Sequence, residues 1–311
     1  MVGARGYLGC LFTMVRRSLA RIRTLLKLTR VWNLLIIVLA QYTSVLCLIP
    51  AEPARTLNAW GVTIGYGDAT WSDPVILLLA VSTCLIAAAG YAINDYFDVK
   101  IDLINKPERV VVGRNLSRRK AMMMHLVFSG AGIVLGAALG WNVALVHLLS
   151  AVLLWWYSAG LKRGAFGNVA IALLTAASLL VIYLPYRYEG RALGLYAAFA
   201  FVMTLVREVV KDMEDVRGDQ AYGCRTLPIR WGIARTKVYA GTLVLSLMAA
   251  VVAVHVKLMP LPVNYFLALV MLPLGLFSYQ LMKADTVREF HRLSQWSKYI
   301  LVLGVLSMFV L

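Results

Sequence analysis

Long apolar stretches separated by short charged segments dominate this 311-residue chain. A helix needs roughly 20 apolar residues to cross a bilayer, and two of the stretches, 143–160 and 296–311, are short for that. The pattern therefore predicts an all-α membrane protein with about nine transmembrane helices in a bundle, and eight is the alternative count. The predicted helices cover residues 31–49, 74–93, 120–140, 143–160, 166–186, 192–210, 236–256, 261–282 and 296–311.

Composition and charge support a membrane protein rather than a soluble domain. Hydrophobic residues make up 61% of the chain, and the formal net charge is +16. Such a charge also suits a nucleic-acid partner, but its placement follows the positive-inside rule. With a cytoplasmic N-terminus, 27 of the 31 Lys and Arg residues fall on the cytoplasmic side of the predicted helices. We therefore expect a multi-pass integral membrane protein, with a lipid bilayer and no nucleic acid as partner.

The N-terminal segment differs from the rest of the chain. Residues 11–30 mix basic and apolar residues at helical period, which is typical of a helix lying on anionic lipid. No signal peptide is evident. The predicted domains are an N-terminal interfacial segment, 1–30, on the cytoplasmic side and a transmembrane domain, 31–311. The four cysteines and four histidines show no metal or redox spacing, and we assign them no role.

Two acidic clusters share one spacing. The first triplet is Asp95, Asp98 and Asp102, and the second triplet is Asp212, Asp215 and Asp219. Each steps by three and then four residues, so each lies on one face of a helix, and both fall on the predicted cytoplasmic side. Each follows an apolar helix and precedes a basic loop, like a weak internal repeat facing a central cavity. Pro107 and Gly218 are predicted to end the two helices.

Carboxylates at bilayer depth are costly, so two triplets indicate a shared cation. Mg²⁺ prefers oxygen ligands and bridges carboxylates to substrate phosphates. Two solvated helix ends are the alternative, but they do not explain an identical spacing. A diphosphate held here would leave an electron-poor organic fragment in an apolar, aromatic-lined cavity, which suits an isoprenoid. The cations expected around the diphosphate are Arg109, Lys162, Lys211 and Arg225.

At these residues the chain resembles the UbiA superfamily of intramembrane prenyltransferases. That family's first motif, N-D-x-x-D-x-x-x-D, is matched by Asn94, Asp95, Asp98 and Asp102, and its second, D-x-x-x-D, by Asp215 and Asp219. The segments INKPERVVVG, YSAGLKR with Gly167-Asn168, and LTRVWN resemble flanking family segments. Val110, Val112 and Val31 stand where prolines are common. The resemblance runs from about Arg30 to Leu227.

The resemblance implies that Mg²⁺ bridges both motifs to a prenyl diphosphate, whose ionisation gives an allylic cation that an acceptor attacks. The residues implied to be catalytic and closest to the metal are Asp95, Asp98, Asp215 and Asp219, with Asp102 and Asp212 as further ligands or orienters. Those implied to bind substrate are Asn33, Asn94, Arg109, Tyr157, Lys162, Lys211 and Arg225. Tyr157 is equally well explained as an interfacial anchor.

The acceptor is not decided by any single residue. The strings REVVKDMEDVRGD and INKPER look most like the branch that transfers geranylgeranyl to geranylgeranylglycerol phosphate, where a hydroxyl is the nucleophile. An aromatic acceptor of quinone biosynthesis, such as 4-hydroxybenzoate or a naphthoate, is the alternative. Prenyl chain length, the general base and oligomeric state stay open.

One segment suggests a different class of protein. Residues 63–68 read TIGYGD, which resembles a potassium-channel filter built from backbone carbonyls. A filter needs a pore helix before it, and Pro53 and Gly61 make a poor one, so we expect a turn-rich outside loop. A cation transporter explains the aspartates but not the basic loops. The motif of the CDP-alcohol phosphotransferases is absent from both triplets.

Overall fold

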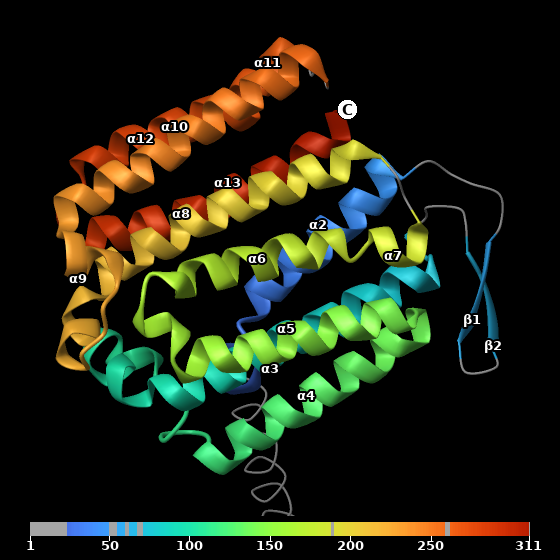
Figure 1. The fold of residues 1–311 in the computed structure, drawn as a ribbon, viewed down its shortest axis with the longest axis horizontal. Coiled ribbons are helices and arrows are strands. Elements are labelled where there is room, and N and C mark those ends of the chain that lie inside the picture. Colours follow the sequence, from blue (N-terminus) through green and yellow to red (C-terminus); the bar gives the residue numbers. More distant parts are fainter. Residues whose placement is uncertain are drawn as a thin grey trace, which may run out of the picture.

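The protein is a bundle of long helices (Figure 1). The computed structural model describes residues 24–49, 55–59, 62–66, 71–187, 190–258 and 262–310. Within these ranges nine helical segments are long and apolar enough to cross a membrane, which confirms the predicted count and removes the alternative of eight. The elements are α2 (Val31–Leu48), β1 (Arg55–Ala59), β2 (Val62–Tyr66), α3 (Pro74–Asn105), η1 (Pro107–Arg109), α4 (Arg118–Leu139), α5 (Trp141–Ala159), η2 (Leu161–Arg163), α6 (Phe166–Leu180), α7 (Tyr183–Tyr186), α8 (Arg191–Ala221), α9 (Leu227–Trp231), α10 (Ile233–Lys257), α11 (Val263–Phe266), η3 (Leu267–Met271), α12 (Leu272–Lys283), α13 (Val287–Leu306) and η4 (Ser307–Val310).

Helix α8 lies in the middle of the bundle because it contributes to both large apolar clusters. Met203 and Val206 join a cluster with buried residues of α10, α12 and α13. Leu193 and Ala197 join a second cluster with buried residues of α2, α3 and α6. Helix α8 also packs against α6, α13 and α3. The second acidic triplet is therefore carried on an element fixed from several sides.

The two helices that carry the acidic triplets are longer than a bilayer requires. Helices α3 and α8 have 32 and 31 residues. At 1.5 Å per residue each measures about 47 Å, against a hydrocarbon core of about 30 Å. The triplets lie in their last turns rather than beyond apolar helices that end at residues 93 and 210. Continuous helix carries each triplet on one face and fixes its geometry.

Helix α3 has well-defined ends. The Asp73 side chain accepts a hydrogen bond from the Val75 N–H (2.8 Å), and Pro74 occupies the first turn, where its missing N–H costs nothing. The helix ends at Asn105, and Pro107 starts η1, as predicted. Tyr186 donates a hydrogen bond to Asp73 (2.7 Å), which ties α7 to the start of α3.

The prediction that Gly218 ends a helix is wrong. Helix α8 continues through Gly218 to Ala221. Gly218 is buried, and a Cβ there would come within 2.5 Å of the Asn105 side-chain amide. The glycine therefore serves close approach between α3 and α8, which sequence alone does not distinguish from a helix end.

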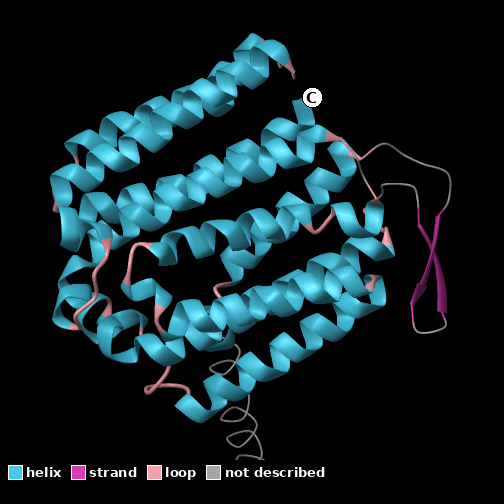
Figure 2. Ribbon diagram, viewed as in Figure 1, coloured by secondary structure: helices cyan, strands magenta, loops and turns pink. Residues whose placement is uncertain are grey.

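The segment with the filter-like sequence forms part of a β-hairpin, not a turn-rich loop. Strands β1 and β2 pair antiparallel, with Leu57 opposite Ile64 and Thr56 opposite Gly65. Figure 2 shows this hairpin standing beside the helical bundle. Successive carbonyls of a hairpin strand point to opposite edges, whereas a filter needs a row of carbonyls that face one pore, so this backbone is not arranged as a filter. Residues 67 and 68 lie outside the described residues.

The predicted interfacial helix falls mostly outside the described part of the chain. Residues 24–28 are helical, and residues 1–23 are not described. Leu28 is fully buried against Ala92 and Ala121. The chain then turns at Arg30, whose φ of 50° is left-handed and strained for a residue with a side chain, before α2 begins.

Candidate active site

Two cations from other segments and an amide of its own helix hold the first acidic triplet. Asp95 accepts a hydrogen bond from Arg30 Nη2 at 2.8 Å. Asp98 accepts one from Asn94 Nδ2 at 2.8 Å and forms a short ion pair with Lys162. Lys162 also donates to Asn94 Oδ1 (3.3 Å). Asn94 and Lys162, both predicted site residues, thus meet at Asp98.

The second triplet is held in a similar way. Asp212 accepts a hydrogen bond from Asn168 Nδ2 (2.8 Å), at the start of α6. Lys106 Nζ lies 2.7 Å from Asp215 Oδ1 and 3.0 Å from Glu214 Oε1. Asp215 and Lys106 are both mostly buried, with side chains 16% and 17% exposed. The loop after the first triplet therefore supplies the cation for the second.

Helices α3 and α8 pack together so that the two triplets lie at the same end of the bundle. Asn105 at the end of α3 donates to the Asp215 carbonyl (3.1 Å) and accepts from the Gly218 N–H (2.8 Å). Asp219 lies close enough to Asp98, on the other helix, for their charges to interact. We call this end of the bundle the acidic end.

Lys211 lies within electrostatic range of both triplets. Its ammonium interacts electrostatically with Asp102 of the first triplet and with Asp215 and Asp219 of the second. Tyr157 is buried, 8% exposed, within electrostatic range of Lys211. Two of the predicted substrate-binding residues are therefore brought together with both triplets.

The remaining predicted residues lie at different distances from this centre. Asn33 lies in the first turn of α2, and its N–H donates to the Arg30 carbonyl (2.7 Å). The Arg225 N–H donates to the Arg163 carbonyl (2.6 Å), so the 160–165 loop and the loop after α8 lie side by side, and the Arg225 side chain is exposed. The side chain of Arg109 lies outside the described residues.

Lys162 is held in a buried position by its loop. Gly167 packs so closely that a Cβ there would meet the Lys162 Cα at 2.7 Å. Burial lowers the pKa of the Lys162 ammonium, and the neighbouring Asp98 opposes that shift. The side chain is 13% exposed. Lys162 is thus a partly desolvated cation fixed against one triplet.

Sequence reasoning missed four residues that the structure places around the triplets. Their only signal was a polar or charged side chain close to a motif, which many other positions share. Their partners lie on other helices or one turn away, so tertiary packing was needed to find them. They are Arg30, Lys106, Asn168 and Glu208.

The donor set of the site fits Mg²⁺. In the described ranges, no group of three or more His, Cys, Asp or Glu residues is drawn together closely enough to hold a metal. Instead Arg30 pairs with Asp95, Lys162 pairs with Asp98, and Lys106 pairs with both Asp215 and Glu214. Among the described residues, the side chains of Asp102 and Asp219 make no hydrogen bond or ion pair. Carboxylate oxygens are the ligands that a hard divalent cation prefers, and a bound Mg²⁺ would replace the cations that now pair with Asp95, Asp98 and Asp215.

An interior cavity begins beside the first triplet. It has a volume of about 160 Å³ and lies among α2, α3, α5 and α6. Tyr91, one helical turn before Asp95, lines it, and the Arg30 guanidinium lies over the Tyr91 ring at 5.0 Å. Ile86, Leu154 and Ile171 make its walls apolar. The cavity therefore leads from the acidic end into the apolar interior.

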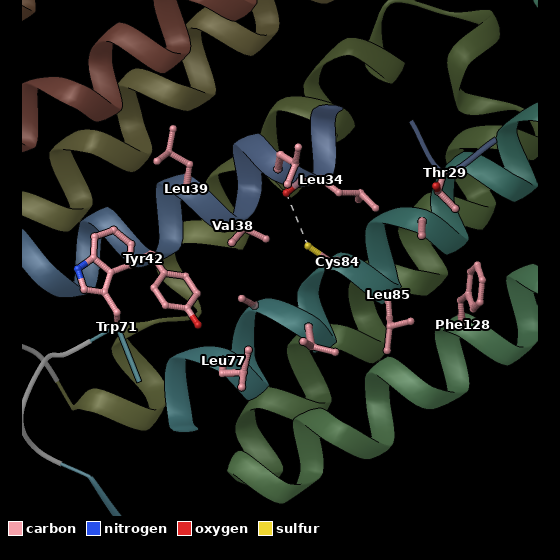
Figure 3. A pocket seen from close by; sticks show the side chains of 14 residues that line it. Thr29, Leu34, Val38, Leu39, Tyr42, Trp71, Leu77, Cys84, Leu85 and Phe128 are labelled. Carbon is pink, nitrogen blue, oxygen red and sulfur yellow. Dashed lines mark hydrogen bonds between the residues drawn. The ribbon is translucent and has the colours of Figure 1, made fainter. Parts of the chain in front are cut away.

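A larger groove of about 720 Å³ runs along the opposite side of the α2–α3 contact (Figure 3). Thr29 stands at one end, and Tyr42 stacked on Trp71 stands at the other. Its lining is almost entirely apolar, and it reaches Phe128 on α4. Thr29 directly precedes Arg30, so one end of the groove lies close to the Arg30 backbone, while the Arg30 guanidinium lies over Tyr91 of the interior cavity.

The chain is similar to a protein family and to individual synthases within it. Residues 57–299 match the UbiA prenyltransferase family. The digeranylgeranylglyceryl phosphate synthase of Metallosphaera sedula is 41% identical over 181 residues, which cover 56% of this chain and 63% of that protein. The synthase of the same name from Methanothermobacter thermautotrophicus is 39% identical over 176 residues, covering 56% and 62%. The match thus spans a little under two thirds of the length of these curated relatives.

Solved structures share the fold. A structure of digeranylgeranylglyceryl phosphate synthase matches with a TM-score of 0.64 at 23% identity, covering 93% of this chain and 98% of that one. A UbiA homolog from Archaeoglobus fulgidus bound to GPP and Mg²⁺ matches with a TM-score of 0.62 at 16% identity, covering 92% and 100%. These likenesses concern the arrangement of helices.

Proposed function

Because this chain belongs to the UbiA prenyltransferase family, we propose that it transfers a prenyl group from a prenyl diphosphate to a membrane-associated acceptor. The preferred reaction is transfer of geranylgeranyl to geranylgeranylglycerol phosphate. The observation that carries this proposal is the contact between α3 and α8, where Asn105 bonds to the Asp215 carbonyl and the Gly218 N–H and so brings the two acidic triplets to one end of the bundle. The names of the sequence relatives support the ether-lipid branch.

Mg²⁺ is the proposed cofactor, as in the A. fulgidus homolog. Bound here, it would neutralise a diphosphate and make it a better leaving group. Asp95, Asp98, Asp215 and Asp219 are the residues proposed to hold it. Asp102 and Asp212 complete or orient that set, and Asn168 fixes Asp212 by its hydrogen bond.

Cationic and amide side chains of the acidic end are proposed to bind the diphosphate oxygens. Lys162 and Lys211 are placed to do so, because both are held against the triplets. They stabilise the negative charge that grows on the diphosphate when its bond to the prenyl carbon breaks. The other residues proposed for substrate binding are Asn33, Asn94, Arg109, Tyr157 and Arg225, joined by Arg30.

Two apolar spaces, one on each side of the α2–α3 contact, suit a reaction between two isoprenoid chains. The interior cavity and the groove lie on either side of the α2–α3 contact, at Tyr91 and Thr29 respectively. An acceptor with its own isoprenoid chain uses both spaces, whereas an aromatic acid needs only one. This arrangement supports geranylgeranylglycerol phosphate over an aromatic acceptor. Apolar walls also keep water from the allylic cation.

The orientation in the membrane is part of the proposal. The loops at the acidic end carry most of the Lys and Arg residues, so this end is proposed to face the cytoplasm. Residues 1–30 are proposed as a segment that lies on the same membrane surface. A water-soluble prenyl diphosphate head then reaches the triplets from the cytoplasmic side.

The test is a product assay with the full-length protein in detergent, Mg²⁺ and geranylgeranyl diphosphate. Geranylgeranylglycerol phosphate, 4-hydroxybenzoate and a dihydroxynaphthoate are offered as acceptors, and products are identified by mass spectrometry. The expected product is the prenylated glycerol phosphate. A prenylated aromatic instead overturns the acceptor, and a folded protein that releases no diphosphate overturns the transferase proposal.

A further inference from the structure

A fourth acidic residue extends the second triplet deeper into the bundle. Glu208 lies one helical turn before Asp212, so positions 208, 212, 215 and 219 share one face of α8. Glu208 is 4% exposed. Burying a carboxylate at this depth costs free energy unless cations neutralise it, so the burial of Glu208 indicates a specific role.

Two cations hold Glu208. Arg207 makes a short ion pair with Glu208 Oε1, and Lys211 Nζ lies 3.4 Å from Oε2. Arg30 lies within electrostatic range as well. Lys211 is a residue assigned to diphosphate binding that makes a direct contact with Glu208. The role of Glu208 is therefore to be sought in what it does to Lys211.

The position of the Lys211 ammonium has to be restrained if it is not to pair with the aspartates of the triplets. Its ammonium is a point charge on a flexible four-carbon chain, and Asp102, Asp215 and Asp219 all lie within its electrostatic range. Without a restraint, the Lys211 ammonium would pair with one of these carboxylates and take the place that Mg²⁺ is proposed to occupy. The bond to Glu208, three residues earlier on the same helix, draws the ammonium toward the deep end of the site.

We propose that Glu208 is a positioning residue that holds Lys211 away from the metal-binding carboxylates and directs it to the diphosphate. This inference rests on the proposed function. It adds that one carboxylate positions a lysine while the carboxylates of the triplets bind the metal. Glu208 neutralises Lys211, so that Lys211 does not pair with Asp102, Asp215 or Asp219 in place of Mg²⁺. Glu208 touches neither metal nor substrate.

The test measures Mg²⁺ binding without turnover. Inorganic diphosphate and Mg²⁺ are titrated by calorimetry into the full-length protein in detergent. In Glu208→Gln the freed Lys211 competes for the carboxylates, and we expect Mg²⁺ to bind about tenfold more weakly. Adding Lys211→Met to that variant removes the competitor, so Mg²⁺ affinity should return to that of Lys211→Met alone.

The outcomes separate this inference from the function on which it rests. A wild-type protein that binds no Mg²⁺ with diphosphate defeats both. Unchanged Mg²⁺ affinity in Glu208→Gln, or no recovery in the double variant, defeats the role of Glu208 only. If Glu208→Gln does not fold, the double variant and Lys211→Met are compared directly, and a difference in Mg²⁺ affinity overturns the inference.

A matched control tests whether any buried carboxylate has this effect. Asp73 has the same 4% exposure and is also held by a hydrogen bond, but it caps the start of α3, at the end of the helix opposite the triplets. Asp73→Asn should lower thermal stability and leave Mg²⁺ affinity unchanged. An equal loss of Mg²⁺ affinity in Asp73→Asn would mean that Glu208 acts through general stability.

Discussion

Asn105 and Gly218 join the two helices that carry the acidic triplets. The Gly218 N–H donates to Asn105 Oδ1 at 2.8 Å, and the Asn105 amide returns a hydrogen bond to the Asp215 carbonyl at 3.1 Å. This contact brings the ends of α3 and α8 together, although Asn105 and Gly218 are 113 residues apart in sequence. The spacing between the triplets therefore depends on a glycine that carries no chemistry itself.

We expect Gly218→Ala to damage both stability and activity. The new Cβ would lie about 2.5 Å from the Asn105 amide, so either the Asn105 side chain moves and loses its hydrogen bonds or the helices separate, at a cost of about 1–3 kcal/mol. Thermal unfolding and diphosphate release measure the two effects. Gly130→Ala is the control, because no atom lies within 4 Å of the place its new methyl group would take and the helix should gain stability. Equal behaviour of the two variants would contradict the close-approach role.

Asp98→Asn and Asp215→Asn should each nearly abolish turnover while the protein stays folded. Each change removes a negative charge from a different triplet. Changes to residues that only orient metal ligands already cost about 10–100-fold, so the loss of a ligand should cost at least about 100-fold. Prenyl transfer and the melting temperature are measured together. Unimpaired transfer by both variants would remove these residues from the metal site.

Lys162 should set part of the alkaline limit of diphosphate binding. Burial lowers its pKa, so the ammonium loses its proton at a lower pH than an exposed lysine does. The charge is present below that pKa and lost above it, so affinity for diphosphate should fall as pH rises.

The comparison for Lys162 uses two substitutions. Lys162→Ala should weaken diphosphate binding at all pH values. Lys162→Arg should move the alkaline limb to higher pH, because a guanidinium stays protonated. Calorimetry of diphosphate binding against pH measures both. Identical pH profiles for wild type and Lys162→Arg would assign the alkaline limb to another group.

Replacing the β1–β2 hairpin with a short flexible linker should leave most of the transferase activity. The hairpin packs near α4 and the start of α3 rather than at the acidic end, so the triplets should keep their geometry. Diphosphate release is compared with ion flux in liposomes. Loss of a potassium conductance in the altered protein, with wild type conducting, would revive the channel interpretation.

The sequence by itself determined the membrane-spanning helices and indicated the chemistry. Hydrophobic stretches are a local property, so they predicted nine spans, and the three-then-four spacing placed each triplet on one helix face. The two triplets have the same spacing, and each is followed by a basic loop. This pattern indicated a site for a divalent metal and a diphosphate. These conclusions need only residues that are neighbours in sequence.

Only the tertiary structure decided how these parts meet. The pairs Arg30–Asp95 and Lys106–Asp215 join residues 65 or more positions apart. A local sequence pattern does not show which helices pack against each other. Glycine is common at helix ends, yet Gly218 lies inside α8. Its lack of a side chain leaves space there for the Asn105 amide. The hairpin was missed for a similar reason, since pairing of β1 with β2 outweighed the turn-forming residues. Helix packing therefore turns two separate acidic stretches into one site, because it brings their charges within reach of the same lysine.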